Sequence, residues 1–384
     1  MLGSMQDMGL LTTFLGYIIF SCFIAFLWAP ILTHYLYKWD ITRRNPYDTT
    51  LALDSRKDKV GTPIMGGLLV VVTVAVITIL FNWSRAFTFV PIGVMLISAF
   101  LGGLDDLLNI FGSKRRNPKL AHVLRLAQVH KNPLMRIWLF LSLPWVAFKR
   151  MSMWLGSHPG KGVQVHEKLL LQFIAGGISA WWIYWKLGEN WREIALPFSA
   201  GGGSAFGGDI NIGFWIVPLV IFVVIAAANS VNISDGLDGL SGGALIPTFG
   251  ALGILAWASG LREVAILDAV TMGALITYTY FNVKPARFQM GDVGSLGLGA
   301  LMGINAVVTN AIVVLPLLAF IFVVETLTVI IQVFGRTFLG RRIFRMAPLH
   351  HHFELIGWSE EKIVMRFWLI HLAAVIFGLW LGLH

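Results

Sequence analysis

The sequence predicts an all-α polytopic membrane protein with about ten transmembrane helices, from its composition and from the spacing of its apolar runs. Hydrophobic residues make up 57% of the 384 residues and charged residues only 13%, whereas a soluble domain has roughly 25% charged residues. Apolar runs of about 20 residues recur from end to end, which is the length a helix needs to cross a hydrocarbon core of roughly 30 Å. A transmembrane barrel would instead alternate apolar and polar residues over segments of about ten.

Ten of these runs are long enough to be taken as spans. The first begins near Leu10, with no basic segment before it and no small-residue cleavage site after it, so it is a span and not a removed signal peptide. No long polar block separates most of the spans, and we expect one membrane domain over residues 1–384. The predicted spans cover residues 10–37, 62–82, 87–108, 167–187, 212–232, 240–259, 263–283, 292–310, 311–335 and 364–384.

Positive charge is distributed unevenly between the two sides of these spans. Of the 29 lysines and arginines, 25 fall in loops on one side. The positive-inside rule places those loops in the cytoplasm and both termini outside, as expected for a protein of the bacterial inner (plasma) membrane. The net charge of +9 is then explained by topology and anionic ligands, and we expect no nucleic-acid partner.

One further apolar stretch, residues 134–156, does not fit as a span. An extra crossing would place the later basic loops outside, and the stretch is interrupted by Pro144 and carries Arg136 and Lys149. We expect an interfacial or re-entrant helix with its tryptophans at headgroup depth. It lies in a long cytoplasmic or interfacial segment of about residues 118–166, to which the sequence assigns no function.

Five aspartates stand at predicted cytoplasmic ends of spans. Asp105 and Asp106 end the third span, where the helix dipole and their mutual repulsion disfavour two carboxylates unless a cation is bound. Asp235 and Asp238 lie between the fifth and sixth spans, and they share one face if that turn starts a helix. Asp292 opens the eighth span, where a helix N-terminus beside glycines can also hold phosphate.

Oxygen ligands without cysteine indicate Mg²⁺ as the metal for this set. Mg²⁺ takes only one or two protein carboxylates, so not all five aspartates are direct ligands. Asn232 is a neutral ligand or hydrogen-bond partner nearby. Any one aspartate alone is equally well explained as a cap or a solvated helix end, but five on one face favour a shared site.

Two further blocks carry chemistry. His350, His351 and His352 lie in the last predicted cytoplasmic loop; consecutive residues rarely converge on one zinc ion, so hydrogen bonding to phosphate or sugar is favoured. Lys59 precedes the glycine-bearing turn Gly61–Gly67, which either supports an anion or nucleotide contact or permits close helix packing.

Five sequence blocks resemble those of the phospho-N-acetylmuramoyl-pentapeptide transferases, within the polyprenyl-phosphate N-acetylhexosamine-1-phosphate transferase superfamily. They occur in the family's order over nearly the whole chain. The Pro-Leu-His-His-His-Phe-Glu sequence is similar to the muramoyl-pentapeptide branch rather than to the N-acetylglucosamine-phosphate branch. The blocks are Gly61–Gly67, Asp105–Asp106, Asn229–Gly239, Met290–Leu296 and Ala347–Glu354.

The resemblance implies a ten-span homodimer in the lipid bilayer with a Mg²⁺-dependent reaction at the cytoplasmic face. Undecaprenyl phosphate attacks UDP-N-acetylmuramoyl-pentapeptide, giving lipid I and UMP. By analogy Asp292 is the Mg²⁺ ligand, Asp105 and Asp106 engage the prenyl phosphate or act as a base, and His350 serves the pyrophosphate. The resemblance also places in the substrate site Lys59, Asn232, Asp235, Gly236, Leu237, Asp238, Phe288, Gln289, His351 and His352.

The chain departs from the family pattern in three places. Asn109 stands where the family has a lysine four residues after the first aspartate, so that phosphate contact must come from elsewhere, with Lys114 as a candidate. Gln289 replaces the aromatic residue before the Met-Gly-Asp block, with Phe288 one residue earlier, which puts uracil stacking in question. The third departure is the segment of about residues 118–166, which is much longer than the family norm and is called the insertion below.

Two other functions compete with this one. A transporter or flippase would need charged residues near span centres and an inverted repeat. The sequence shows no repeat, and the spans are nearly free of charge at their middles. Glu325 is the exception, and a helix-to-helix hydrogen bond explains it. A related UDP-N-acetylglucosamine:undecaprenyl-phosphate transferase is opposed by the histidine block. Direct attack by the lipid and a covalent aspartyl intermediate both stay open.

Overall fold

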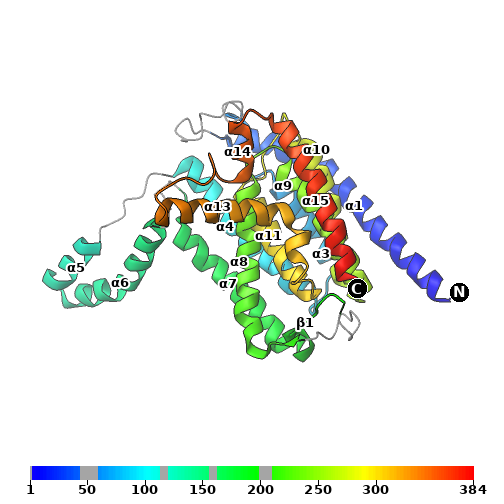
Figure 1. Ribbon diagram of the computed structural model, residues 1–384, viewed down its shortest axis with the longest axis horizontal. Coiled ribbons are helices and arrows are strands. Elements are labelled where there is room, and N and C mark those ends of the chain that lie inside the picture. The colour runs from blue at the N-terminus through cyan, green and yellow to red at the C-terminus, as the bar shows by residue number, and fades with distance from the viewer. Residues whose placement is uncertain (1, 44–58, 113–119, 155–161, 199–209) are drawn as a thin grey trace.

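The computed structural model describes residues 2–43, 59–112, 120–154, 162–198 and 210–384, and it confirms the all-α fold class (Figure 1). In these residues the only strands are β1 (Glu193–Ile194) and β2 (Ile210–Asn211), paired antiparallel. The α-helices are α1 (Leu2–Lys38), α3 (Leu68–Phe81), α4 (Phe89–Phe111), α5 (Leu120–Val129), α6 (Pro133–Trp154), α7 (Val165–Trp182), α8 (Ile216–Ser234), α9 (Leu240–Ala258), α10 (Arg262–Asn282), α11 (Gly291–Val308), α12 (Leu315–Leu318), α13 (Phe320–Phe338), α14 (Leu349–Leu355) and α15 (Glu360–Gly382).

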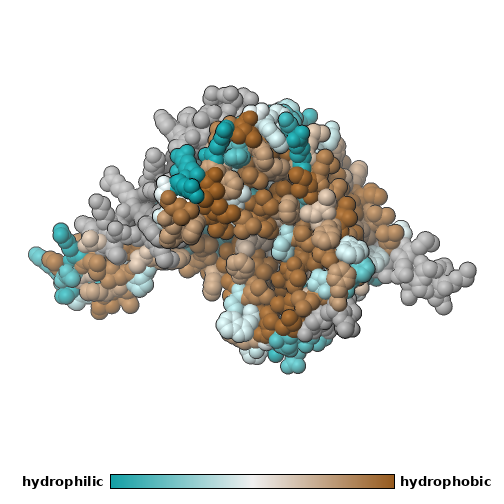
Figure 2. All heavy atoms as spheres, viewed as in Figure 1, coloured by the Kyte–Doolittle hydropathy of each residue, from teal (hydrophilic) through white to brown (hydrophobic). Residues whose placement is uncertain are grey.

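The helices form a multi-pass membrane bundle. Eight helices in the described part are long and apolar enough to cross a membrane: α1, α4, α8, α9, α10, α11, α13 and α15. The other two predicted spans correspond to α3, with 14 residues, and to α7. Figure 2 shows a broad hydrophobic surface over the side of the bundle and hydrophilic residues towards its two ends, as a lipid environment requires.

Helix α11 lies at the centre of the bundle, between α4 and α8, and nearly all of its residues are buried. Glycine permits the close approach of its neighbours. A Cβ atom at Gly102 of α4 would lie 2.0 Å from the carbonyl oxygen of Asp292, and one at Gly67 would lie 2.3 Å from the Cα of Gly294. The Gly61–Gly67 block therefore includes a position required for packing, the second of the two explanations open from the sequence.

The predicted ninth span, residues 311–335, is wrong as one continuous helix. The structure divides it at Ala319 into the short α12 and the longer α13, which runs across α8 in Figure 1. The break leaves backbone groups unpaired inside the bundle, and two buried side chains bond to them. Thr248 Oγ1 donates to the carbonyl of Leu318 at 2.7 Å, and the Nδ1 atom of His371 accepts from the N–H of Ile321 at 3.4 Å.

Besides Asp105, Asp106 and Glu360, two buried carboxyl groups lie within the described candidate spans, and only one of them, Glu325, was expected from the sequence. The structure confirms the helix-to-helix bond of Glu325, whose Oε1 accepts from the backbone N–H of His350 at 3.1 Å. The second group is Asp268 in α10, whose Oδ1 accepts from Asn305 Nδ2 of α11 at 2.6 Å. Both carboxyl groups join helices, and neither forms part of a row of charges through the bundle.

The insertion forms a helical hairpin of α5 and α6 that projects from the side of the bundle (Figure 1). The predicted helix over 134–156 is present as α6, and α5 packs on it through Val123 and Ala127. In the bundle proper, α6 meets α7.

Candidate functional site

Carboxylates from two helices meet on one lysine at the end of the bundle where α8 and α10 finish and α11 begins. Asp105 projects from α4 and is buried, while Asp292 lies in the first turn of α11 with its side chain 24% exposed. The ammonium of Lys168, from the first turn of α7, lies 2.5 Å from a carboxylate oxygen of each. The charge of one lysine thus offsets the repulsion between two carboxylates that the helix packing holds together.

Asn232 and Asp106 fix the position of Asp292. The Nδ2 atom of Asn232 donates to Asp292 Oδ1 and lies equally close to the Ser295 hydroxyl, at 2.9 Å in both cases. The carboxylate of Asp106 accepts from the backbone N–H groups of Asp292 and Val293, both at 3.1 Å. Asp106 therefore caps the N-terminus of α11, where two N–H groups have no partner within the helix and a negative charge is favourable.

The turn between α8 and α9 is not helical, so the expected i, i+3 arrangement of Asp235 and Asp238 on one helix face is wrong. The Ser241 hydroxyl donates to Asp235 Oδ1 at 2.6 Å, whereas Asp238 Oδ1 lies 2.8 Å from the ammonium of Lys59. Gly239 has φ +84°, which starts α9 from a left-handed residue. Burial raises the pKa of Asp235 to about 6, against the stabilising bond from Ser241.

A buried glutamate that the sequence analysis missed holds this turn. Glu360 opens α15, and its Oε1 lies 2.5 Å from Lys59 Nζ and accepts from the N–H of Asp238 at 2.8 Å. Lys284 lies 3.4 Å from the other oxygen of Glu360. Glu360 directly follows the N-cap Ser359, which explains it locally as a first-turn acid, and only the fold shows its contact with Lys59.

His350 reaches the same turn from α14. A Cβ atom at Gly236 would lie 2.3 Å from His350 Nε2, so glycine is required there for the ring to approach. The Nδ1 atom lies 3.2 Å from Glu325 Oε2. Among the described residues Nε2 has no hydrogen-bond partner, although the histidine is fully buried. A buried ring nitrogen without a partner beside an acidic turn is a candidate ligand contact.

The other two histidines bond within their own loop and helix. His351 Nδ1 lies 2.5 Å from Glu354 Oε2, and His352 Nδ1 accepts from the N–H of Arg345 at 3.3 Å. Neither interaction needs a ligand.

A small pocket opens beside the turn, and five of the predicted substrate-site residues line it. Gln289 lines it, with its Oε1 accepting from Arg43 at 3.1 Å. Phe288 does not line it, because its side chain is fully buried and its ring lies against those of Tyr278 and Phe281. Its place in the substrate site stays a prediction. The lining residues are Arg43, Asp235, Gly236, Leu237, Asp238, Asn282 and Gln289.

Asp105, Asp106 and Asp292, which lie together beside Lys168, form an acidic cluster that fits a divalent cation of the Mg²⁺ type. Lys168 Nζ shows that a positive centre can sit between Asp105 and Asp292. Within the described part of the chain no three acidic or histidine side chains form a complete cage. One or two carboxylates together with substrate phosphates and water is the usual Mg²⁺ arrangement.

Lys168 is the other site residue that the sequence analysis overlooked. Lys168 is one of the 25 basic residues on the predicted cytoplasmic side, whereas the residue predicted to make the missing phosphate contact is Lys114. Lys114 lies outside the described residues. The signal available in the sequence was a lysine in the first turn of a span, directly after the insertion.

Known proteins are similar to this chain over most of its length. The model described as glycosyl transferase family 4 matches residues 160–310, which include Lys168, Asn232 and Asp292. Phospho-N-acetylmuramoyl-pentapeptide-transferase of Chloroflexus aurantiacus is 33% identical over 340 residues, which cover 85% of this chain and 78% of the relative. The proteins of the same name from a Geobacillus species and Desulforamulus reducens are 31% and 34% identical, over 95% and 84% of this chain and 96% and 82% of their own lengths.

Proposed function

This chain belongs to the phospho-N-acetylmuramoyl-pentapeptide transferase family, and on that premise we propose that it forms lipid I from UDP-N-acetylmuramoyl-pentapeptide and undecaprenyl phosphate, releasing UMP. One observation carries the proposal. Asp105, Asp292 and Lys168 converge at one end of a membrane bundle, beside a turn lined by Asp235 and Asp238. A lipid phosphate and a water-soluble nucleotide can both reach such a place.

The main difficulty of the reaction is to bring two anionic phosphates together. Lys168 offsets negative charge at the acidic cluster, and Asn232 orients Asp292. Asp292, the most exposed carboxylate of the cluster, is the proposed Mg²⁺ ligand, with Asp105 beside it. Mg²⁺ bound there would neutralise the pyrophosphate and stabilise the departing UMP.

The residues around the turn between α8 and α9 are proposed to bind the nucleotide substrate. His350 Nε2 is free to bond the pyrophosphate, and Asp235, Gly236, Leu237 and Asp238 line the nucleoside-side pocket. Lys59 acts through Asp238 and Glu360 as a positioning residue, because it is buried against both. Asp106 has the same kind of role, since both of its oxygens bind the start of α11.

The location of the enzyme is also a proposal. The basic side of the chain supports an inner-membrane protein with this site facing the cytoplasm. The family resemblance supports a homodimer, which crosslinking of the purified protein in nanodiscs tests.

The test is UMP release by the purified protein with undecaprenyl phosphate, Mg²⁺ and one UDP-sugar at a time. We expect release with UDP-N-acetylmuramoyl-pentapeptide and none with UDP-N-acetylglucosamine. Asp292→Asn should reduce turnover by at least about a thousandfold, since it removes the charge of the metal ligand. Asp40→Asn is the matched control, because Asp40 lies outside the group formed by Asp105, Asp292 and Lys168, in a turn with φ +52° where asparagine is tolerated. Near-normal turnover of Asp292→Asn would refute the assignment.

A further inference from the structure

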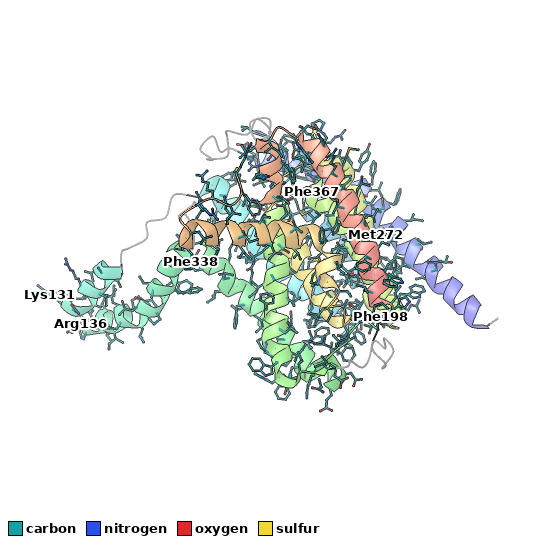
Figure 3. The ribbon with its side chains drawn as sticks, viewed as in Figure 1. Lys131, Arg136, Phe198, Met272, Phe338 and Phe367 are labelled. Atoms are coloured by element: carbon teal, nitrogen blue, oxygen red, sulfur yellow. The ribbon has the colours of Figure 1, made fainter. Side chains whose placement is uncertain are left out.

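The hairpin of α5 and α6 carries charge of one sign only. Between Leu107 and His166 the chain contains ten lysines and arginines and no aspartate or glutamate. Figure 3 shows Lys131 and Arg136 at the outer tip of the hairpin, and both are exposed, as is Arg125. No described acidic side chain forms an ion pair with any of these three. The positive field of the hairpin is therefore available to a partner outside the chain.

The same hairpin exposes an apolar helix face. Leu134, Ile137, Trp138, Leu141 and Trp145 of α6 are between 38% and 75% exposed, and their spacing places them on one side of the helix. Trp145 meets the ring of His166, with 4.9 Å between ring centroids, and the other four side chains are exposed within the described residues. Tryptophan and leucine beside basic residues are typical of helices that lie in a membrane interface.

Length and charge place α6 along the membrane surface. Its apolar part, Pro133–Phe148, is about 24 Å long at 1.5 Å per residue, which is shorter than a hydrocarbon core of roughly 30 Å. A crossing would also separate Arg136 from Lys149 by the bilayer. Lying in the interface keeps both basic ends on one side.

We propose that the α5–α6 hairpin binds anionic phospholipid headgroups at the membrane surface, with its basic tip on the phosphates and its apolar face in the lipid. Charge complementarity selects this occupant. A second copy of the chain would offer a predominantly basic surface on the same side, where 25 of the 29 lysines and arginines lie. An anionic membrane surface attracts each of them.

The hairpin is joined to the acidic cluster by a short connection. Just before α7, the N–H of Val163 donates to Asp105 Oδ1 at 2.5 Å, and Lys168 lies in the first turn of α7. Headgroup binding by the hairpin thus holds the lipid surface next to the chain segment that enters the site.

The proposal is tested on the full-length chain with one environment-sensitive label. Cys22→Ser removes the native thiol, Leu141→Cys places a bimane label on the apolar face, and nanodiscs contain spin-labelled lipid as the quencher. We expect quenching to rise as phosphatidylglycerol replaces phosphatidylcholine, and this rise to weaken at high salt. Lys131→Glu with Arg136→Glu should weaken the apparent affinity for phosphatidylglycerol more than about tenfold.

The matched control is Arg341→Glu with Arg342→Glu, which reverses two exposed charges outside the hairpin and should leave quenching unchanged. Equal quenching with and without phosphatidylglycerol would overturn the proposal, as would protection of the label by crosslinkable contact between two copies. If the Lys131→Glu, Arg136→Glu variant does not fold, the dependence of quenching on phosphatidylglycerol and salt in the labelled protein without these two changes still tests the proposal. The measurement needs no turnover, so its result is independent of the proposed reaction.

Discussion

The ammonium of Lys168 lies between two carboxylates that are far apart in the sequence. Asp105 and Asp292 are brought together because α4 and α11 pack closely at Gly102. Asn109, which replaces the family's lysine, is one turn beyond Asp105 and cannot supply a charge. Lys168 supplies positive charge to this cluster from a helix that follows the insertion.

Lys168→Met should therefore lower UMP release by roughly a hundredfold or more, because the two carboxylates lose the group that offsets their repulsion and a charge that faces the phosphates. Turnover at saturating substrates is the measurement. Lys186→Met is the matched control, since Lys186 is an exposed lysine at the other end of the same helical segment. Equal losses in the two variants would show that Lys168 has no special role.

Asp235 offers a prediction on pH. Its pKa is raised to about 6 by burial, so the folded protein bears the cost of a buried charge above pH 6, and that cost declines as pH falls through about 6. Asp235→Asn removes the charge and keeps an acceptor for Ser241. The variant should have a higher Tm than the parent at pH 8, by an amount corresponding to about 1 to 2 kcal/mol, and a smaller advantage at pH 5. An advantage that does not change with pH would contradict this cause.

Among the elements, the division of the predicted ninth span into α12 and α13 shows how a helix break is tolerated in a membrane bundle. The carbonyl of Leu318 and the N–H of Ile321 lose helical partners and gain Thr248 and His371 instead. His371 Nε2 in turn lies 2.9 Å from the carbonyl of Ala244, so one ring joins α9, α13 and α15. These buried polar side chains hold the start of α13, the helix from which Glu325 reaches His350.

Thr248→Val should destabilise this junction by about 1 to 3 kcal/mol, because the carbonyl of Leu318 is left without a partner. The expected change is a Tm lower by a few degrees in detergent solution. Thr326→Val is the control: the Thr326 hydroxyl bonds a carbonyl of its own helix, whose backbone bond remains. A Tm loss in Thr326→Val as large as that in Thr248→Val would contradict the proposed role of the break.

At the scale of the whole molecule, the sequence predicted what depends on composition and on position within a span. The all-α class, the helix that Asp292 opens and the turn containing Asp235 follow from hydropathy and spacing. The contacts of Lys168 and Glu360 join residues more than sixty positions apart, and no local pattern specifies such pairs. The helix break at Ala319 was not predicted for a related reason: the side chains that bond its free backbone groups, Thr248 and His371, come from α9 and α15.

The orientation of the molecule in the membrane gives the last prediction. The positive-inside rule predicts that the site and the α5–α6 hairpin face the cytoplasm and that both termini lie outside. In a Cys22→Ser background, single cysteines at Asn132 and Arg342 should react with an impermeant maleimide only after the cells are permeabilised, whereas those at Trp215 and His384 should react in intact cells. All four native side chains are exposed, so accessibility within the fold does not limit the reaction. Asn132 and Arg342 must label on the same side of the membrane, because Asn132 lies on the hairpin that leads to Lys168 and Arg342 lies in the loop that leads to His350. If Asn132 and Arg342 label on opposite sides, the chain crosses the membrane between them a different number of times, and Asp105 and His350 cannot share the reaction centre that the proposed function requires.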